Sequence, residues 1–187
     1  KPLPIGGFSK DPDAKRGYAT GGIAKGYKLH AVYGDAPLPI AWEVVPMNAA
    51  EPVVAARLFM WCQLRGYVLG DKNYDDNKLH RVANACGGQL VTERKRSNAK
   101  GLGHGPQSAG RLRSIELLRQ EFGQVLLSCR DTIERNFGWL TNHSAGLAPL
   151  PAWVRRIYRV TQWVQAKMIG HYLYTQLNPL SFSLADE

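Results

Sequence analysis

Residues 66–92 read GYVLGDKNYDDNKLHRVANACGGQLVT, and they predict a strand, a helix and a second strand. The apolar run at 66–70 is bounded by glycines, as expected of a short buried strand. Residues 75–85 can form a helix, and residues 89–92 form a further short strand. This alternation of strand and helix is typical of an α/β protein.

A hairpin and a helix are predicted upstream of this segment. The pattern alternates at 27–33 (YKLHAVY) and is rich in β-forming residues at 38–45 (LPIAWEVV), with a turn at 34–37 between the two runs. Apolar residues then recur at helical spacing over 53–64. Residues 1–26 are rich in glycine, proline and charge, so we expect a strand stub followed by a loop there.

Two helical regions are predicted downstream. Residues 92–110 (TERKRSNAKGLGHGPQSAG) are polar, basic and glycine-rich, which predicts an exposed loop. Apolar spacing then predicts a long helix over 112–140, with a break near Gly123, and a closing helix over 153–177. The elements together predict an α/β fold in which a mixed sheet carries helices on its faces.

Length and composition favour a single domain. The chain has 187 residues, of which 44% are hydrophobic, and this is enough for one full core. We expect one domain over residues 1–178 and a tail at 179–187. No apolar run approaches the roughly 18 residues that a membrane helix needs, and no secretion signal is recognisable, so we expect a soluble cytoplasmic protein. The three cysteines form no CxxC pair, which argues against a disulfide framework or a zinc site.

The net charge of +9 favours a polyanionic partner, because cations that neutralise phosphates release counterions. An RNA-binding role would fit this charge equally well. The basic loop and the helix after it supply the predicted DNA contacts, which are Arg94, Lys95, Arg96, Lys100, Arg111 and Arg113. The alternative interpretation is a solvated surface without a ligand.

Asp71 is the first candidate for chemistry. It directly follows a strand with buried character, and functional groups converge at the carboxyl ends of strands in open α/β sheets. Asp75 and Asp76 lie one helical turn further on. We interpret these two as solvated acids at a helix N-terminus, where they complement the helix dipole.

Glu134 is the second candidate. It borders the apolar stripe of the predicted long helix and lies four residues after Arg130. An ordinary surface ion pair is the alternative reading of that spacing. Two carboxylates on different elements could instead hold Mg²⁺, which prefers oxygen ligands and supports phosphodiester cleavage and strand transfer.

Five strings occur in order and carry a family resemblance: KPLPIGGFSKDPDAKRG, KGYKLHAVYG, WEVVPMNAAE, GYVLGDKNYDD and RDTIERNFGWL. From Lys1 to about Leu177, the chain resembles the catalytic domain of DDE transposases from bacterial insertion sequences. The resemblance implies an RNase H-like fold. It also implies metal-dependent DNA strand cleavage and strand transfer in the bacterial cytoplasm, in association with the nucleoid.

The resemblance also implies site residues and partners. The family's second catalytic Asp corresponds to Asp71, and its catalytic Glu to Glu134 in an Arg-x-x-x-Glu signature that begins at Arg130. These carboxylates would be ligands of two Mg²⁺ or Mn²⁺ ions. The implied partners are the transposon ends, the target DNA and a second copy of the chain, as a homodimer on DNA.

The sequence departs from the family pattern in two places. The family's first catalytic Asp is expected just upstream of Lys1, so this Asp and part of the opening strand are expected to be missing, and Asp11 and Asp13 are only weak substitutes. Leu127 and Thr141 stand where the family commonly has Tyr and Lys, which puts those DNA contacts in doubt. The alternatives are an inactive transposase-derived DNA-binding domain and an RNase H-like DNA nuclease.

Overall fold

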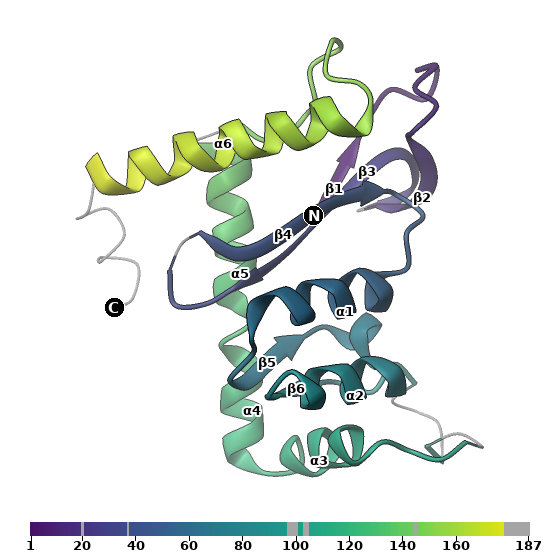
Figure 1. Ribbon diagram of the computed structural model, residues 1–187, viewed down its shortest axis with the longest axis vertical. Coiled ribbons are helices and arrows are strands. Elements are labelled where there is room, and N and C mark those ends of the chain that lie inside the picture. Colours follow the sequence, from purple (N-terminus) through teal and green to yellow (C-terminus); the bar gives the residue numbers. More distant parts are fainter. Residues whose placement is uncertain (20, 37, 97–100, 103–104, 144–145, 178–187) are drawn as a thin grey trace. The chain divides into compact units, whose positions relative to one another are not determined.

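The computed structural model describes residues 1–19, 21–36, 38–96, 101–102, 105–143 and 146–177. The chain divides into two compact units (Figure 1). The first unit comprises Lys1–Ala49 and Ile133–Glu187, and the second comprises Ala50–Thr132. Each unit is described separately below.

The first unit contains an antiparallel sheet built around one long strand. Its strands are β1 (Pro2–Pro4), β2 (Lys15–Ala19), β3 (Gly22–Tyr33) and β4 (Pro39–Pro46). β3 pairs with each of the other three. The predicted strand stub and the predicted hairpin, which is β3–β4, are therefore confirmed.

The prediction of a loop through residue 26 was wrong, because β2 lies within that segment. β2 pairs antiparallel with the first part of β3, from Lys15 opposite Gly26 to Ala19 opposite Gly22. Gly21, between the two strands, and Gly22, at the start of β3, have φ values of 89° and 138°, which only glycine adopts readily. β2 is largely exposed, so its sequence lacks the apolar alternation that marks a half-buried strand.

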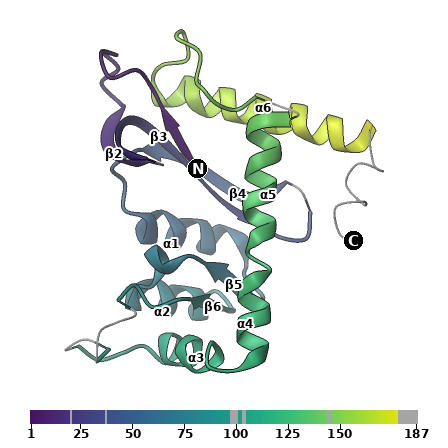
Figure 2. The ribbon, with the colours of Figure 1, turned by 180° about the vertical axis from the view of Figure 1, so that it is seen from behind.

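The core of the first unit lies between the sheet and α6 (Ile157–Leu177), which packs along β4 (Figure 2). Val160, Val164 and Met168 recur on one face of this helix and are buried with Leu3 and Leu29 of the sheet. This spacing of four residues gives the helix a single apolar stripe. The predicted closing helix is confirmed, although it begins four residues later than expected.

Two acids of the N-terminal segment set the start of α6. The Asp11 carboxylate accepts hydrogen bonds from the backbone N–H of Arg156 (2.9 Å) and from the Tyr27 hydroxyl (2.7 Å). Asp13 accepts from the backbone N–H of Ile157 (3.1 Å). These carboxylates satisfy N–H groups at the helix N-terminus and complement its dipole. Asp11 and Asp13, the weak substitutes for a catalytic Asp, thus have a structural role.

Asp11→Ala is expected to lower the free energy of unfolding by about 2–3 kcal/mol, because it removes hydrogen bonds to a buried charged group and leaves the Tyr27 hydroxyl without its acceptor. Urea denaturation measures the effect. Asp35→Ala, which removes an exposed carboxylate from the turn between β3 and β4, is the control and should change stability by less than about 0.5 kcal/mol. Equal effects of the two substitutions would contradict the capping role.

The second unit is built on the segment that predicted the fold. Its elements begin with α1 (Glu51–Cys62), β5 (Gly66–Gly70), a 3₁₀ turn at Lys72–Tyr74, α2 (Asn77–Ala85) and β6 (Gly88–Thr92). β5 and β6 pair in parallel, with α2 as the connection between them. α2 packs against β6, and α1 packs against α2 (Figure 1). The predicted strand–helix–strand order and the helix before it are confirmed.

The predicted long helix is instead three short helices. They are α3 (Ala109–Leu117), α4 (Glu121–Ser128) and α5 (Asp131–Gly138), which leads into a π-helical turn at Trp139–His143. The first break falls close to the predicted one. α4 approaches the end of α3 so closely that a Cβ at Gly123 would collide with the carbonyl oxygen of Leu117. The second break, at Cys129–Arg130, was not predicted.

Helices and strands occur together in the chain, so the predicted α/β class is confirmed, but the predicted mixed sheet is not found among the described residues, because pairing is antiparallel in the first unit and parallel in the second. The strands form two sheets, one in each unit, and within the described parts of the chain no pairing joins them. The RNase H-like arrangement and the single domain stay predictions, and the tail at 179–187 lies outside the described residues. Among the helices described here, none is both long and apolar enough to cross a membrane.

Candidate functional site

Asp71 stands at the carboxyl end of β5, as the sequence predicted. β5 and β6 are parallel, with Gly70 opposite Thr92, so the two strands end at the same edge of the second unit. Asp71 is partly exposed, and its Oδ1 accepts a hydrogen bond from the backbone N–H of Asn73 (2.7 Å). This bond fixes the carboxylate at the start of the 3₁₀ turn. Among the described residues, none donates a hydrogen bond to Oδ2 of Asp71. This oxygen is therefore available as a ligand atom for a cation.

Glu134 lies on the part of α5 that belongs to the first unit, and its side chain is exposed. One turn further on, Phe137 stacks edge-on against Tyr33 of β3, with ring centroids 5.5 Å apart, and Leu140 is buried. α5 therefore joins the core on one face and leaves Glu134 at the border with solvent. This agrees with the position that the apolar spacing predicted.

Arg130 differs from its predicted setting. It lies in the turn between α4 and α5, where its backbone N–H donates to the carbonyl of Leu127 (3.1 Å). Arg130 therefore directly precedes α5 and does not lie within one continuous helix with Glu134. Thr141, where the family resemblance implied Lys, donates its hydroxyl to the carbonyl of Phe137 (2.6 Å).

The donor chemistry of Asp71 and Glu134 fits a hard divalent cation. Both offer carboxylate oxygens and both are accessible to solvent. In the parts of the chain that the structure describes, no group of three His, Cys, Asp or Glu residues could hold a metal. Mg²⁺ needs no such cage, because it keeps several waters and takes one or two carboxylates together with substrate phosphates. Asp71 and Glu134 belong to different units, so their sharing of one ion stays a prediction.

Asp76 and Asp75 have different roles, although both were predicted to be solvated helix acids. Asp76 caps α2 by accepting hydrogen bonds from the backbone N–H groups of Lys78 (2.8 Å) and Leu79 (3.0 Å), which confirms that prediction. Asp75 contradicts it, because only 3% of its side chain is exposed. The guanidinium group of Arg111 donates two hydrogen bonds to the carboxylate of Asp75, from Nε (2.6 Å) and from Nη2 (2.7 Å).

The Asp75–Arg111 pair ties three segments of the second unit together. The backbone N–H of Lys95, in the segment after β6, donates to Asp75 Oδ2 (2.9 Å), and the buried His80 of α2 lies 3.7 Å from Oδ1. Burial alone would raise the pKa of Asp75, but the hydrogen bonds from Arg111 and Lys95 outweigh it and hold that pKa well below its usual range. The pair is therefore ionised at neutral pH.

The residues predicted to contact DNA differ in their solvent exposure and in the hydrogen bonds that they make. Lys95 and Arg96 are exposed, whereas Arg94 donates through Nη2 to the carbonyl of Gly101 (2.8 Å). Arg111 is largely buried against Asp75, which weighs against a direct phosphate contact. Arg113 is exposed and donates through Nε to Gln89 (3.1 Å). Lys100 lies outside the described residues.

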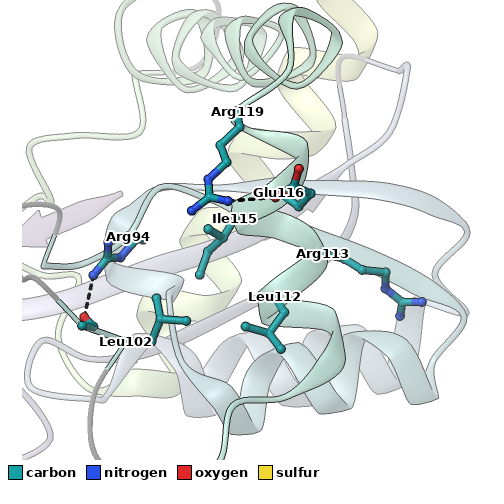
Figure 3. Close-up of a pocket in the computed structure, with 8 residues that line it drawn as sticks. Arg94, Leu102, Leu112, Arg113, Ile115, Glu116 and Arg119 are labelled. Carbon is teal, nitrogen blue, oxygen red and sulfur yellow. Dashed lines mark hydrogen bonds and ion pairs between the residues drawn. The ribbon is translucent and has the colours of Figure 1, made fainter.

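Arg94 and Arg113 both line an open pocket of about 530 Å³ in the second unit, although the side chain of Arg113 points away from Arg94 (Figure 3). A third arginine, Arg119, which sequence reasoning did not single out, lines the same pocket. The other lining residues are Gly101, Leu102, Leu112, Ile115 and Glu116. An arginine near a helix end looks like any solvated residue in sequence, so only the fold reveals this grouping.

One comparison with known proteins gave a match. A family model described as the Transposase DDE domain matches residues 2–151, which span parts of both units. No curated protein and no solved structure matches the chain.

Proposed function

Since the chain belongs to the Transposase DDE domain family, we propose that it is the catalytic domain of a DNA transposase with an RNase H-like fold. In this role it cleaves DNA strands and transfers them to a target in a reaction that depends on divalent metal ions. The observation that carries the proposal is the place of Asp71, which is fixed at the carboxyl end of a parallel strand with one carboxylate oxygen still available.

Asp71 and Glu134 would hold the metal, as one or two Mg²⁺ or Mn²⁺ ions. Such ions, when bound, activate the attacking water or 3′-hydroxyl and stabilise the leaving oxygen. The chain's own contribution is to position the ligands: the Asn73 N–H orients the Asp71 carboxylate, and the packing of Phe137 on Tyr33 anchors the helix that carries Glu134. Arg130 would orient Glu134 or hold a DNA phosphate.

The partners in this proposal are the DNA of the transposon ends, the target DNA and a second copy of the chain on DNA. Exposed cations after β6 suit the phosphate backbone, since charge neutralisation there supplies affinity without sequence preference.

Replacing Lys95 and Arg96 together with glutamine is expected to weaken DNA binding uniformly across sequences. Each exposed cation that neutralises a phosphate contributes about one unit to the slope of log affinity against log salt concentration, so the double variant should lose roughly two units. Fluorescence anisotropy across a salt series measures this slope. An unchanged slope would show that these two residues do not contact phosphate.

An assay of cleavage and joining tests the proposed function. The family resemblance puts the first catalytic Asp before Lys1, so the assay uses a chain extended upstream of Lys1, incubated with transposon-end DNA and Mg²⁺ or Mn²⁺. The proposal expects nicked and joined products that disappear with EDTA. Salt-sensitive binding without nicking would instead indicate an inactive DNA-binding domain. Nicking without joining would indicate a nuclease.

A further inference from the structure

The arginine-lined pocket of the second unit has an excess of positive charge. Arg94, Arg113 and Arg119 line it, and Glu116 is the one acid among the lining residues (Figure 3). Glu116 pairs with Arg119 at 3.0 Å, but both side chains are more than half exposed, so water screens this pair. The guanidinium group of Arg113 points away from Arg94 and Arg119 (Figure 3), so an anionic group that enters the pocket meets the two guanidinium groups of Arg94 and Arg119 against the one carboxylate of Glu116.

One of these two guanidinium groups is held in place by the protein. Arg94 is anchored on the carbonyl of Gly101, whereas Arg113 donates to the side chain of Gln89. A guanidinium group fixed in this way loses less side-chain freedom when a ligand binds. The planar forks of Arg94 and Arg119 match phosphate oxygens, and their faces can stack on a base.

The pocket also has an apolar part. Leu112 is 44% exposed on α3, and Leu102 and Ile115 lie beside it in the same lining (Figure 3). The volume of about 530 Å³ falls within the range of sites that take small organic ligands. Apolar side chains next to cations suit a ligand that has a flat apolar ring and a phosphate.

We infer that this pocket takes one unpaired nucleotide of a DNA strand, with its phosphate at the arginines and its base against Leu112 and Ile115. The inference rests on the proposed function, because it assumes that the chain binds DNA. A base inside a duplex must be unstacked and unpaired before it can enter, which costs free energy, whereas a base in a single-stranded extension enters without this cost. The pocket therefore favours single-stranded ends over continuous duplex.

The test compares binding of the chain to a blunt duplex and to the same duplex with a short single-stranded extension. Wild type is expected to bind the extended duplex about fivefold or more tightly, which corresponds to about 1 kcal/mol of added binding free energy. Arg119→Gln and Leu112→Ala should each bring the ratio of the two affinities close to one. Arg81→Gln, which removes an exposed arginine on α2 outside the pocket, should keep the preference of wild type. Circular dichroism verifies that each variant is folded.

The outcomes separate the two proposals. If wild type binds neither DNA, the proposed function fails and the nucleotide pocket fails with it. If wild type binds both DNAs equally, or if the preference survives both Arg119→Gln and Leu112→Ala, the nucleotide pocket is overturned and the proposed function stands. Loss of the preference in Arg81→Gln as well would also overturn the pocket, because the effect would then follow net charge alone.

Discussion

Asp71→Asn and Glu134→Gln are each expected to lower the rate of DNA cleavage about a thousandfold or more in a chain extended upstream of Lys1. The reason is that a neutral amide binds a divalent cation more weakly than a charged carboxylate does, and the metal contributes several kcal/mol to transition-state stabilisation, where each 1.36 kcal/mol is tenfold in rate. Asn at position 71 still offers an oxygen to the Asn73 N–H, so the local turn should persist.

Asp76→Asn is the matched control for these substitutions. It makes the same chemical change five residues after Asp71, and Asn is also a favourable N-cap, so α2 should remain intact. Cleavage by this variant should be close to that of wild type. The measurement is the rate of nicking of one radiolabelled substrate by wild type and by each of the three variants. Full activity in both Asp71→Asn and Glu134→Gln would defeat the catalytic assignment.

Asp75→Ala is expected to lower the free energy of unfolding by about 3–5 kcal/mol, the usual cost of leaving a buried charge without its partner. The substitution leaves the Arg111 guanidinium group without its carboxylate partner and also removes the acceptor of the Lys95 N–H. Urea denaturation measures the loss. The double variant Asp75→Leu with Arg111→Met should recover much of it, since an apolar pair of similar volume avoids the desolvation of two charges. A cost below 1 kcal/mol for Asp75→Ala would contradict the buried ion pair.

The same pair makes stability dependent on pH in the acid range. Folding lowers the pKa of Asp75, so its contribution is fully present above the unfolded pKa of about 3.9 and is lost as the pH falls through the folded value. The stability difference between wild type and Asp75→Asn should therefore be constant from about pH 5 to 8 and shrink below about pH 4. A difference that grew on acidification would have the wrong sign for this mechanism.

The sequence predicted those elements whose pattern is local. The glycine-bounded run at 66–70 and the helix and strand after it carry their own signals, as does the β3–β4 hairpin. β2 was not predicted, because it is exposed and therefore lacks an apolar alternation, and because its pairing with β3 stabilises it. The apolar spacing over 112–140 continues through three helices, since the breaks arise from turns and from the contact of Gly123 with the end of α3.

The candidate site was predictable to the same extent. Asp71 follows a recognisable strand, so its position at the strand end could be read from sequence. No local signal marks the partner of Asp75, which lies 36 residues away, or the capping of α6 by Asp11, which acts across 145 residues. Such long-range polar contacts are set by tertiary packing, and the identity of the two residues alone does not reveal them.

Iron-directed cleavage of the polypeptide tests most directly whether Asp71 and Glu134 share one cation. Fe²⁺ in place of Mg²⁺, with ascorbate and peroxide, generates radicals that cut the backbone next to the bound ion. In the chain extended upstream of Lys1, we expect cuts near both Asp71 and Glu134, and both should disappear with excess Mg²⁺ or with either Asp71→Asn or Glu134→Gln. Cuts near only one of the two residues, or cuts near Glu134 that persist in Asp71→Asn, would contradict the shared metal site.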